Sequence, residues 1–345
     1  MKRVLALTLT FMFLLGMTAC GQTQTSQETP AASESAESSA PAESGASETP
    51  PSDTAEESIV PAQEGETDSA EENPGNFNLE TATVTLNSGY EMPVAGLGTY
   101  ALSDEECYNS VTALLENGGR LIDTASYYGN EESIGRAIRD SDVPREEIFV
   151  TTKIYPTEFD NPEEAIEGCL ERLDIGYIDL MLLHHPGSND TAAYKAIEKA
   201  IQEGKVHTAG ISCYYIRETD SFLPKVSMKP ELIQNEIHPF YQDSKVVEHI
   251  QKKEITVQSW YPLGGRGHTG AMFRSPVLQK IAAAHGKSAA QVILRWNLQR
   301  GVCVIPGSSN PEHIWENISI FDFALTNAEM EAIAGLDRNE KHDWY

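Results

Sequence analysis

IFVTTKIYPTEFDNPEEAIEGCLERLDIGYIDLMLLHH (148–185) contains two apolar, strand-like runs separated by a segment with helical periodicity. The runs are IFVTTKI (148–154) and YIDLMLLHH (177–185), and the segment between them is PEEAIEGCLERLD (162–174). Strands that alternate with helices are typical of a sheet with parallel strands. Both runs end in polar residues, with Lys153 near the end of the first and His184 near the end of the second.

The same alternation extends in both directions along the chain. Six more strand-like runs lie at VAGLGT (94–99), RLIDTA (120–125), VHTAGIS (206–212), ELIQNEI (231–237), ITVQSWYPL (255–263) and VCVIPGS (302–308). Further helix-period segments lie at 104–118, 191–204 and 288–301. Eight strands alternating with helices predict an α/β fold, the (β/α)8 or TIM barrel, over residues 76–345.

Two other features bear on this fold. The stretch ATVTLNSGYEMP (82–93) predicts an N-terminal β-hairpin with its turn at Asn87–Gly89. A doubly wound open sheet is the alternative to a barrel. The first strand, however, is not followed by the Gly-x-Gly-x-x-Gly pattern that a dinucleotide-binding sheet of that kind uses.

Polar residues occupy the ends of all eight predicted strands. In a barrel of this type the functional site lies at the carboxyl ends of the strands, so these side chains should converge on one pocket. In chain order they are Thr99, Asp123, Lys153, His184, Ser212, Gln234, Trp260 and Ser308.

Asp123, Lys153 and His184, with Tyr128 in DTASYYGNEE (123–132), form a chemically coherent set. A nearby lysine ammonium is expected to lower the pKa of a tyrosine from its ordinary value of about 10, and a carboxylate keeps that lysine charged. The histidine can orient a carbonyl oxygen near the phenol, which then delivers a proton. These four residues include no nucleophilic Ser or Cys and no metal triad. The electrons are therefore expected from a cofactor, and hydride from a nicotinamide fits.

Several separated motifs together make the chain resemble the aldo-keto reductases over about 80–340, and most closely the bacterial diketogluconate reductase type. The resemblance implies reduction of an aldehyde or ketone to an alcohol with NAD(P)H. It also assigns the proton donor to Tyr128, which directly precedes Gly-Asn, and the other catalytic roles to Asp123, Lys153 and His184. The motifs are GLGTY, RLIDTASYYGNEESIG, VTTKI, IDLMLLHHP, GIS, QNE, SWYPLG and IPGSSNPEHIWENISIFDFAL.

The resemblance also implies residues that bind the cofactor and the substrate. Trp260 would stack on the nicotinamide, and Tyr127 and His185 would line the substrate pocket beside His184. The expected cofactor-binding residues are Thr99, Tyr100, Asp123, Ser212, Gln234, Trp260, Leu263, Gly264, Ile305, Ser308, His313, Glu316 and Asn317.

Three positions depart from the family pattern in ways that concern the cofactor. Cys213 follows Ser212 where asparagine is usual, Gly307 replaces a lysine and His313 replaces an arginine. Cationic contacts to the 2′-phosphate favour NADPH, and histidine is charged only below about pH 6.5. The expectation is therefore NADPH with weak discrimination and appreciable use of NADH.

The N-terminal part has the features of an exported lipoprotein. Lys2 and Arg3 precede an apolar stretch that ends in MTAC, so residues 1–20 are predicted to be a lipoprotein signal with Cys20 as the lipidated residue. Residues 21–75 contain thirteen acidic and no basic residues and few large apolar ones, which predicts a disordered tether. The expected location is extracytoplasmic, with the protein anchored by lipid to the bacterial cell membrane.

Charge and cysteine content restrict the partners. From residue 76 onward there are 39 acidic and 23 basic residues, a balance of −16, which argues against a nucleic-acid partner. Besides Cys20, four cysteines are scattered without metal-type spacing, so no metal site is predicted and buried core thiols are expected. The expected substrate is a small carbonyl or sugar-like compound, and the expected state is a monomer. The alternative function is a barrel lipoprotein without catalysis, which binds sugar or senses nicotinamide.

Overall fold

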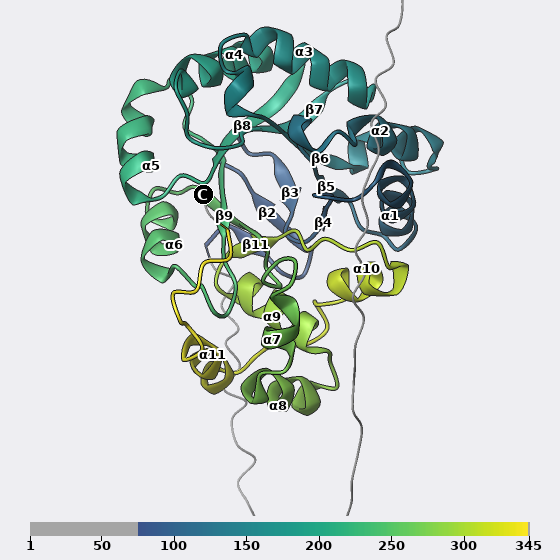
Figure 1. The fold of residues 1–345 in the computed structure, drawn as a ribbon, viewed down its shortest axis with the longest axis vertical. Coiled ribbons are helices and arrows are strands. Elements are labelled where there is room, and N and C mark those ends of the chain that lie inside the picture. Colours follow the sequence, from purple (N-terminus) through teal and green to yellow (C-terminus); the bar gives the residue numbers. More distant parts are fainter. Residues whose placement is uncertain (1–74, 344–345) are drawn as a thin grey trace, which may run out of the picture. The chain divides into compact units, whose positions relative to one another are not determined.

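Eight parallel strands pair in chain order, from β4 to β11, and helices surround them (Figure 1). This computed structural model describes residues 75–343. The strands of the barrel are β4 Leu97–Gly98, β5 Leu121–Asp123, β6 Phe149–Ile154, β7 Ile178–Leu183, β8 Val206–Ser212, β9 Leu232–Glu236, β10 Thr256–Trp260 and β11 Val302–Val304.

The helices follow the strands along the chain. The α-helices are α1 Asp104–Glu116, α2 Glu131–Asp140, α3 Pro162–Leu173, α4 Asp190–Gln202, α5 Ile216–Phe222, α6 Ser244–Gln251, α7 Thr269–Phe273, α8 Pro276–His285, α9 Ala289–Gln299, α10 Pro311–Ile318 and α11 Asn327–Ala334. Four 3-10 helices are η1 Ser126–Tyr128, η2 Arg145–Glu147, η3 Pro156–Glu158 and η4 Leu223–Lys225.

The first and last strands meet and close the sheet into a barrel. Val304 N donates to Val94 O at 2.9 Å, and Gly96 N donates to Val304 O at 3.0 Å. This close approach requires a residue without a side chain, because a Cβ on Gly98 would lie 2.6 Å from Ile305 O. The predicted TIM-barrel class is confirmed.

Below the barrel lies a small antiparallel sheet of β1 Phe77–Asn78, β2 Thr83–Thr85 and β3 Glu91–Pro93. The predicted hairpin is therefore present with one additional strand. Val84 and Met92 of this sheet are fully buried in a cluster that also contains Leu180 and Leu182 from β7. The small sheet thus covers the inside of the barrel at one end and leaves the carboxyl ends of the strands for a site.

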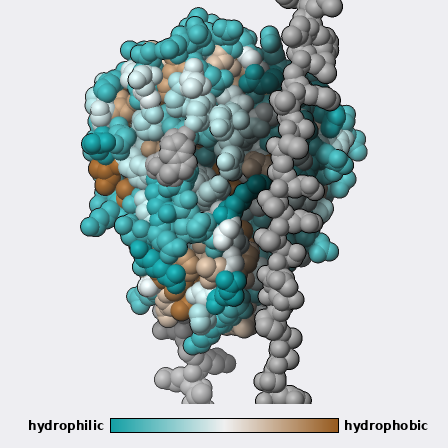
Figure 2. Space-filling view, in the orientation of Figure 1, coloured by the Kyte–Doolittle hydropathy of each residue, from teal (hydrophilic) through white to brown (hydrophobic). Residues whose placement is uncertain are grey.

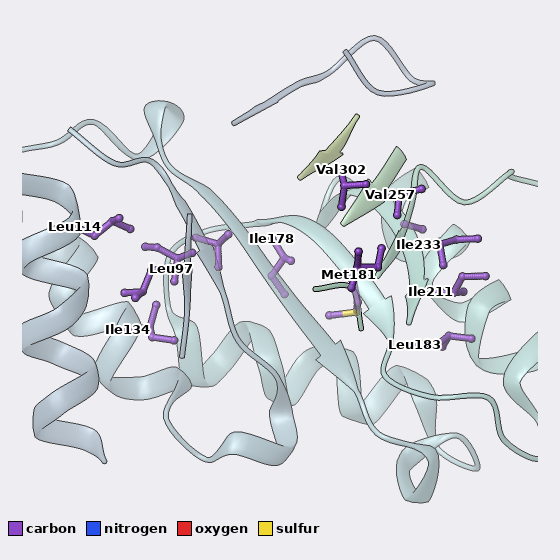
Figure 3. Packing of buried hydrophobic residues seen from close by; sticks show 14 of the residues in the cluster. Leu97, Leu114, Ile134, Ile178, Met181, Leu183, Ile211, Ile233, Val257 and Val302 are labelled. Carbon is purple, nitrogen blue, oxygen red and sulfur yellow. The ribbon is translucent and has the colours of Figure 1, made fainter. Parts of the chain in front are cut away.

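The outward-facing strand residues form a second core beneath the helices (Figure 3). Ile178, Met181 and Leu183 of β7 pack there with Leu114 of α1 and Ile134 of α2. From Leu180 to Leu183 successive residues of β7 belong alternately to the inner and the outer core, which is the alternation expected of barrel strands.

The eight predicted strand runs all contain a strand, although most of the strands are shorter than predicted. The run at 302–308, for example, contains β11 at Val302–Val304 only. Figure 2 shows a mostly hydrophilic face on which hydrophobic residues gather only in small groups.

The predicted signal, Cys20 and nearly all of the predicted tether lie outside the described residues. Between residues 75 and 343 no helix is long and apolar enough to cross a membrane.

Candidate active site

A buried ion pair lies at the carboxyl ends of the neighbouring strands β5 and β6. Lys153 Nζ lies 2.5 Å from Asp123 Oδ1 and donates to Thr124 O at 2.7 Å, and the lysine side chain is 0% exposed. Gln234 Nε2 from β9 donates to the other carboxylate oxygen of Asp123 at 2.8 Å. A buried charge pair persists only when its hydrogen bonds are satisfied, as they are here.

Asn130 holds the backbone around this pair. Its Nδ2 donates to Thr99 O at 2.9 Å, and its Oδ1 accepts from the Thr124 hydroxyl at 2.8 Å. Thr99 in turn donates through Oγ1 to Asp123 O at 3.0 Å. The hydroxyl of Thr99 is thus used to fix the strand end, and the prediction that Thr99 binds the cofactor stays a prediction. The sequence analysis missed Asn130, which is buried at the start of α2.

Tyr128 is placed by the short helix η1, which directly follows β5. Tyr128 N donates to Ala125 O, and Gly129 ends the turn in the left-handed conformation with φ 71°. A β-branched or bulky residue would be strained at that position. The turn places the phenol oxygen 3.4 Å from His184 Nε2 and the ring 5.2 Å from Lys153 Nζ. The four predicted catalytic residues therefore meet in one place.

Burial controls the protonation of Tyr128 and His184. Burial, reinforced by the charge of Asp123, raises the pKa of Tyr128 well above its usual value. Burial, reinforced by the charge of Lys153, lowers the pKa of His184 well below its usual value, so the imidazole is neutral. The net shift is therefore opposite to the expected one, because burial and the charge of Asp123 outweigh the stabilisation of the phenolate that was expected from Lys153.

Tyr127 and Tyr155 form an aromatic wall beside the phenol. Tyr127 is 63% exposed and stacks on Tyr155 at 4.5 Å between ring centroids. Tyr155 lies edge-on to both His184 and His185, at 5.5 and 5.6 Å. Tyr127 and His185 line the cavity as predicted, whereas Tyr155 was missed because no motif of the sequence singles it out.

A cavity of about 1150 Å³ runs from this wall across the mouth of the barrel. Thr99, Lys153 and Gly264, although predicted as site residues, do not line it, and Gly265 is the loop glycine that does. Lys153 lies behind the surface, where it can act only through Asp123 and Tyr128. The predicted residues that line the cavity are Tyr100, Asp123, Tyr127, Tyr128, His184, His185, Ser212, Gln234, Trp260, Leu263, Ile305, Ser308, His313, Glu316 and Asn317.

The far half of the cavity ends at the start of α10. Asn310 caps this helix by accepting from Glu312 N at 2.9 Å, and Ser308 Oγ accepts from Asn310 N at 3.1 Å. A helix N-terminus lined with hydroxyls and amides favours anions such as phosphate. Gly307 contributes no side chain, and the basic side chains that line the cavity include His313 and Lys287.

Trp260 and Cys213 both line the cavity, in the region that the family pattern implies for the nicotinamide. The indole Nε1 of Trp260 is buried and has no hydrogen-bond partner among the described residues. Cys213 adopts φ 63°, a left-handed conformation that asparagine tolerates better than cysteine does. Burial raises the pKa of Cys213 to about 12, so it is an inert thiol. The four cysteines of the described chain are all free and buried, as expected.

Comparison with known proteins decides the family. The pattern of the Aldo/keto reductase family matches residues 94–338, which covers all eight barrel strands and the site. This chain belongs to that family. It is therefore an oxidoreductase by family.

Relatives that are named for different activities show similar identity to this chain. The chain is 38% identical to morphine 6-dehydrogenase of Pseudomonas putida over 74% of this chain and 90% of that protein. It is also 38% identical to glyoxal reductase of Bacillus subtilis (strain 168), over 75% of this chain and 94% of that protein. Among solved structures, MGS-M4, an aldo-keto reductase enzyme from a Medee basin deep-sea metagenome library, matches with a TM-score of 0.73 and 37% identity. That match covers 75% of this chain and 96% of MGS-M4.

Proposed function

We propose that this aldo-keto reductase reduces a small aldehyde or ketone to the alcohol with NAD(P)H, with Tyr128 as the proton donor. The observation that carries the proposal is the position of the Tyr128 hydroxyl. It lines the cavity 3.4 Å from His184 Nε2, with the buried Lys153–Asp123 pair directly behind it.

Each of the four residues has a separate task. Tyr128, protonated because it is buried, donates its proton to the carbonyl oxygen as the alcohol forms. Neutral His184 can donate a hydrogen bond to the same oxygen and so hold it near the phenol. Lys153 and Asp123 form a fixed dipole that stabilises negative charge as it develops on the phenol oxygen. Gln234 and Thr124 hold that dipole in place.

The residues present fit a nicotinamide cofactor. Trp260 presents a flat indole to the cavity, and its unpartnered Nε1 is a donor that a bound group can use. Ser212 and Gln234 would hold the carboxamide, and the start of α10, with Ser308, would hold the phosphate-bearing half. When bound, the reduced nicotinamide would supply the hydride that the carbonyl carbon receives.

The cofactor preference follows from the same end of the cavity. With Gly307 and His313 in place of two cations, NADPH loses charge-assisted contacts to its 2′-phosphate. Ser308, Ser309 and Asn310 remain as neutral partners that line the cavity. We therefore expect modest preference for NADPH and measurable use of NADH.

Small carbonyl or sugar-like compounds suit the substrate half. Its wall consists of the rings of Tyr127, Tyr155, His185 and Tyr261, which favour compact, partly polar molecules. Glyoxal, named in the relative from Bacillus subtilis, is a reasonable first compound to test. The monomeric state remains a prediction.

The location remains a proposal from the sequence. Lys2, Arg3, the apolar stretch and Cys20 support a lipid-anchored, extracytoplasmic enzyme. Substitution Cys20→Ser should prevent lipidation and leave an uncleaved precursor, as measured by intact-mass analysis of the membrane fraction. An unlipidated wild-type protein with its N-terminus intact in the cytosol would contradict the proposal.

A simple assay separates an active reductase from a protein that only binds the cofactor. The purified protein is mixed with NADPH or NADH and glyoxal or another simple aldehyde, and the loss of absorbance of the reduced nicotinamide is followed. We expect turnover with both cofactors. Tight cofactor binding by fluorescence, without turnover of any of a panel of aldehydes and ketones, would contradict the proposed reaction.

A further inference from the structure

The loop after β10 and the C-terminal tail meet at the edge of the cavity in a cluster of His268, Glu340 and His342. The tail is defined here as residues 338–343, and the loop as residues 264–268. One ligand atom from each of the three side chains lies within 4.8 Å of the other two. None of the three belongs to the proposed catalytic set, and His268 lies more than 70 residues before Glu340 and His342, so their spacing gave no sign of a site.

His342 is held in the orientation of a metal ligand. Its Nδ1 donates to Gly264 O at 2.7 Å, and its side chain is only 3% exposed. Metal-binding histidines commonly donate their second ring nitrogen to a backbone carbonyl in this way, which fixes the tautomer. In the neutral ring this leaves a lone pair on Nε2.

That lone pair faces a carboxylate. His342 Nε2 lies 3.2 Å from Glu340 Oε1, so a proton or a metal ion must lie between these two atoms while Nδ1 donates to Gly264. The ring of His268 stacks on His342 at 3.8 Å between centroids, and rotation of this exposed side chain would turn its nitrogen toward the other two ligand atoms. A metal ion shared by the three side chains would then be stabilised by all of them.

We propose that His268, Glu340 and His342 bind one divalent transition-metal ion of the Zn²⁺ class, which ties the loop to the tail. Two imidazoles and one carboxylate are a donor set that zinc uses, with water in the fourth position. For all three ligand atoms to make zinc bonds of about 2.0–2.2 Å, they must move somewhat closer to one another than they are in this structure. His268 and Glu340 are exposed and can make this movement, while His342 is already fixed.

The inner side of the same imidazole is a weaker candidate. Glu236, His238 and His342 also lie close enough together to bind a metal ion. The Glu236 carboxylate, however, already accepts from His238 Nε2 at 3.0 Å and from the backbone N of His342 and Asp343 at 2.6 and 3.1 Å. Its oxygens are therefore occupied in holding the tail, and the outer set is favoured.

The position of the ion has a consequence for the cavity. Gly265 and Arg266 from the loop and Asp343 from the tail line its edge, and Arg266 Nη2 donates across the mouth to Ala101 O at 2.6 Å. A metal ion between the loop and the tail would fix two walls of the cavity relative to each other. It would not touch Tyr128 or His184.

Metal binding by the full chain tests the proposal directly. The protein is freed of metal with a chelator and titrated with Co²⁺ in a spectrophotometer and with Zn²⁺ against a coloured chelator. We expect one ion per chain and the intense visible bands of four-coordinate Co²⁺, without a sulfur-to-metal charge-transfer band. His268→Ala and Glu340→Gln should each weaken binding by about tenfold or more.

Controls distinguish this site from general binding by an acidic protein. His249→Ala removes a histidine that pairs with Asp220 elsewhere on the surface, and its affinity should equal that of the wild type. Binding that all three substitutions leave unchanged would place the ion elsewhere and overturn the proposal. So would wild-type protein that binds no Co²⁺ or Zn²⁺ at micromolar concentration, which would show that a proton alone bridges His342 and Glu340.

Discussion

At the floor of the cavity, Lys153 and Asp123 are buried on neighbouring strands, whereas at its rim His268 and Glu340 are exposed on a loop and on the tail. The floor is held by backbone and side-chain hydrogen bonds from several strands. The rim is held by a few contacts, chiefly those of Glu236 and His342. The difference suggests that the floor determines the reaction and the rim determines which substrate enters.

The largest combined effect on stability and activity is expected from removing one partner of the buried Lys153–Asp123 pair at the cavity floor. Lys153→Met leaves the Asp123 charge buried without its partner, which should lower the free energy of unfolding by about 3–5 kcal/mol. It should also lower kcat by about a hundredfold or more, because the phenol loses its fixed dipole. Denaturant unfolding and steady-state kinetics measure both.

An exposed lysine provides the matched control for that variant. Lys252→Met removes only an i,i+4 pair with Glu248 on α6 and should change stability by less than about 0.5 kcal/mol. Equal stability of the two variants would show that the buried pair does not hold the floor together.

A smaller effect is expected from weakening the attachment of the tail at the cavity rim. Glu236→Gln removes the charge that accepts from the backbone N of His342 and Asp343, at a cost of about 1.5–3 kcal/mol in attachment of the tail. Hydrogen exchange at residues 338–343 should accelerate, and KM should rise while kcat changes little. A kcat that falls as far as in Lys153→Met would remove the distinction between floor and rim.

The cofactor end of the cavity should respond to an added cation by about tenfold. His313→Arg places a guanidinium at the start of α10, where it can make a charge-assisted contact to the 2′-phosphate of NADPH. The ratio of kcat/KM for NADPH to that for NADH should therefore rise by about tenfold. An unchanged ratio would show that the 2′-phosphate is bound away from residue 313.

The smallest expected effect is an absence of change. Since burial raises the pKa of Tyr128, the phenol should keep its proton through about pH 9, a unit below the ordinary value of about 10. The kcat for carbonyl reduction should therefore be flat from pH 7 to 9. A fall with a midpoint near pH 7 would mean that Lys153 lowers the pKa of the phenol after all.

Sequence reasoning succeeded where residues are constrained by regular elements. Strand periodicity and polar strand ends predicted the barrel and brought Asp123, Lys153 and His184 to one place, because parallel strands must end together. Family resemblance then distinguished Tyr128 from Tyr127. The fold class and the convergence of these side chains needed no structural information.

Where sequence reasoning failed, the cause was a long-range contact or an environment. Asn130 and Tyr155 follow no periodicity, and only the folded chain brings His268 to His342. The pKa of Tyr128 depends on its burial and on the charge of Asp123, and the residue types alone do not reveal how these combine. The third strand of the small sheet, β1, has only two residues and no pattern of its own.

Steady-state kinetics of Tyr128→Phe and Tyr127→Phe test the central claim most directly. The two rings are adjacent, but only Tyr128 contacts His184, while Tyr127 stacks on Tyr155. Tyr128→Phe should lower kcat by about 10²–10⁴ with unchanged cofactor affinity, and Tyr127→Phe should keep most of the activity. The reverse result, with Tyr128→Phe active and Tyr127→Phe inactive, would contradict the assignment of the proton donor.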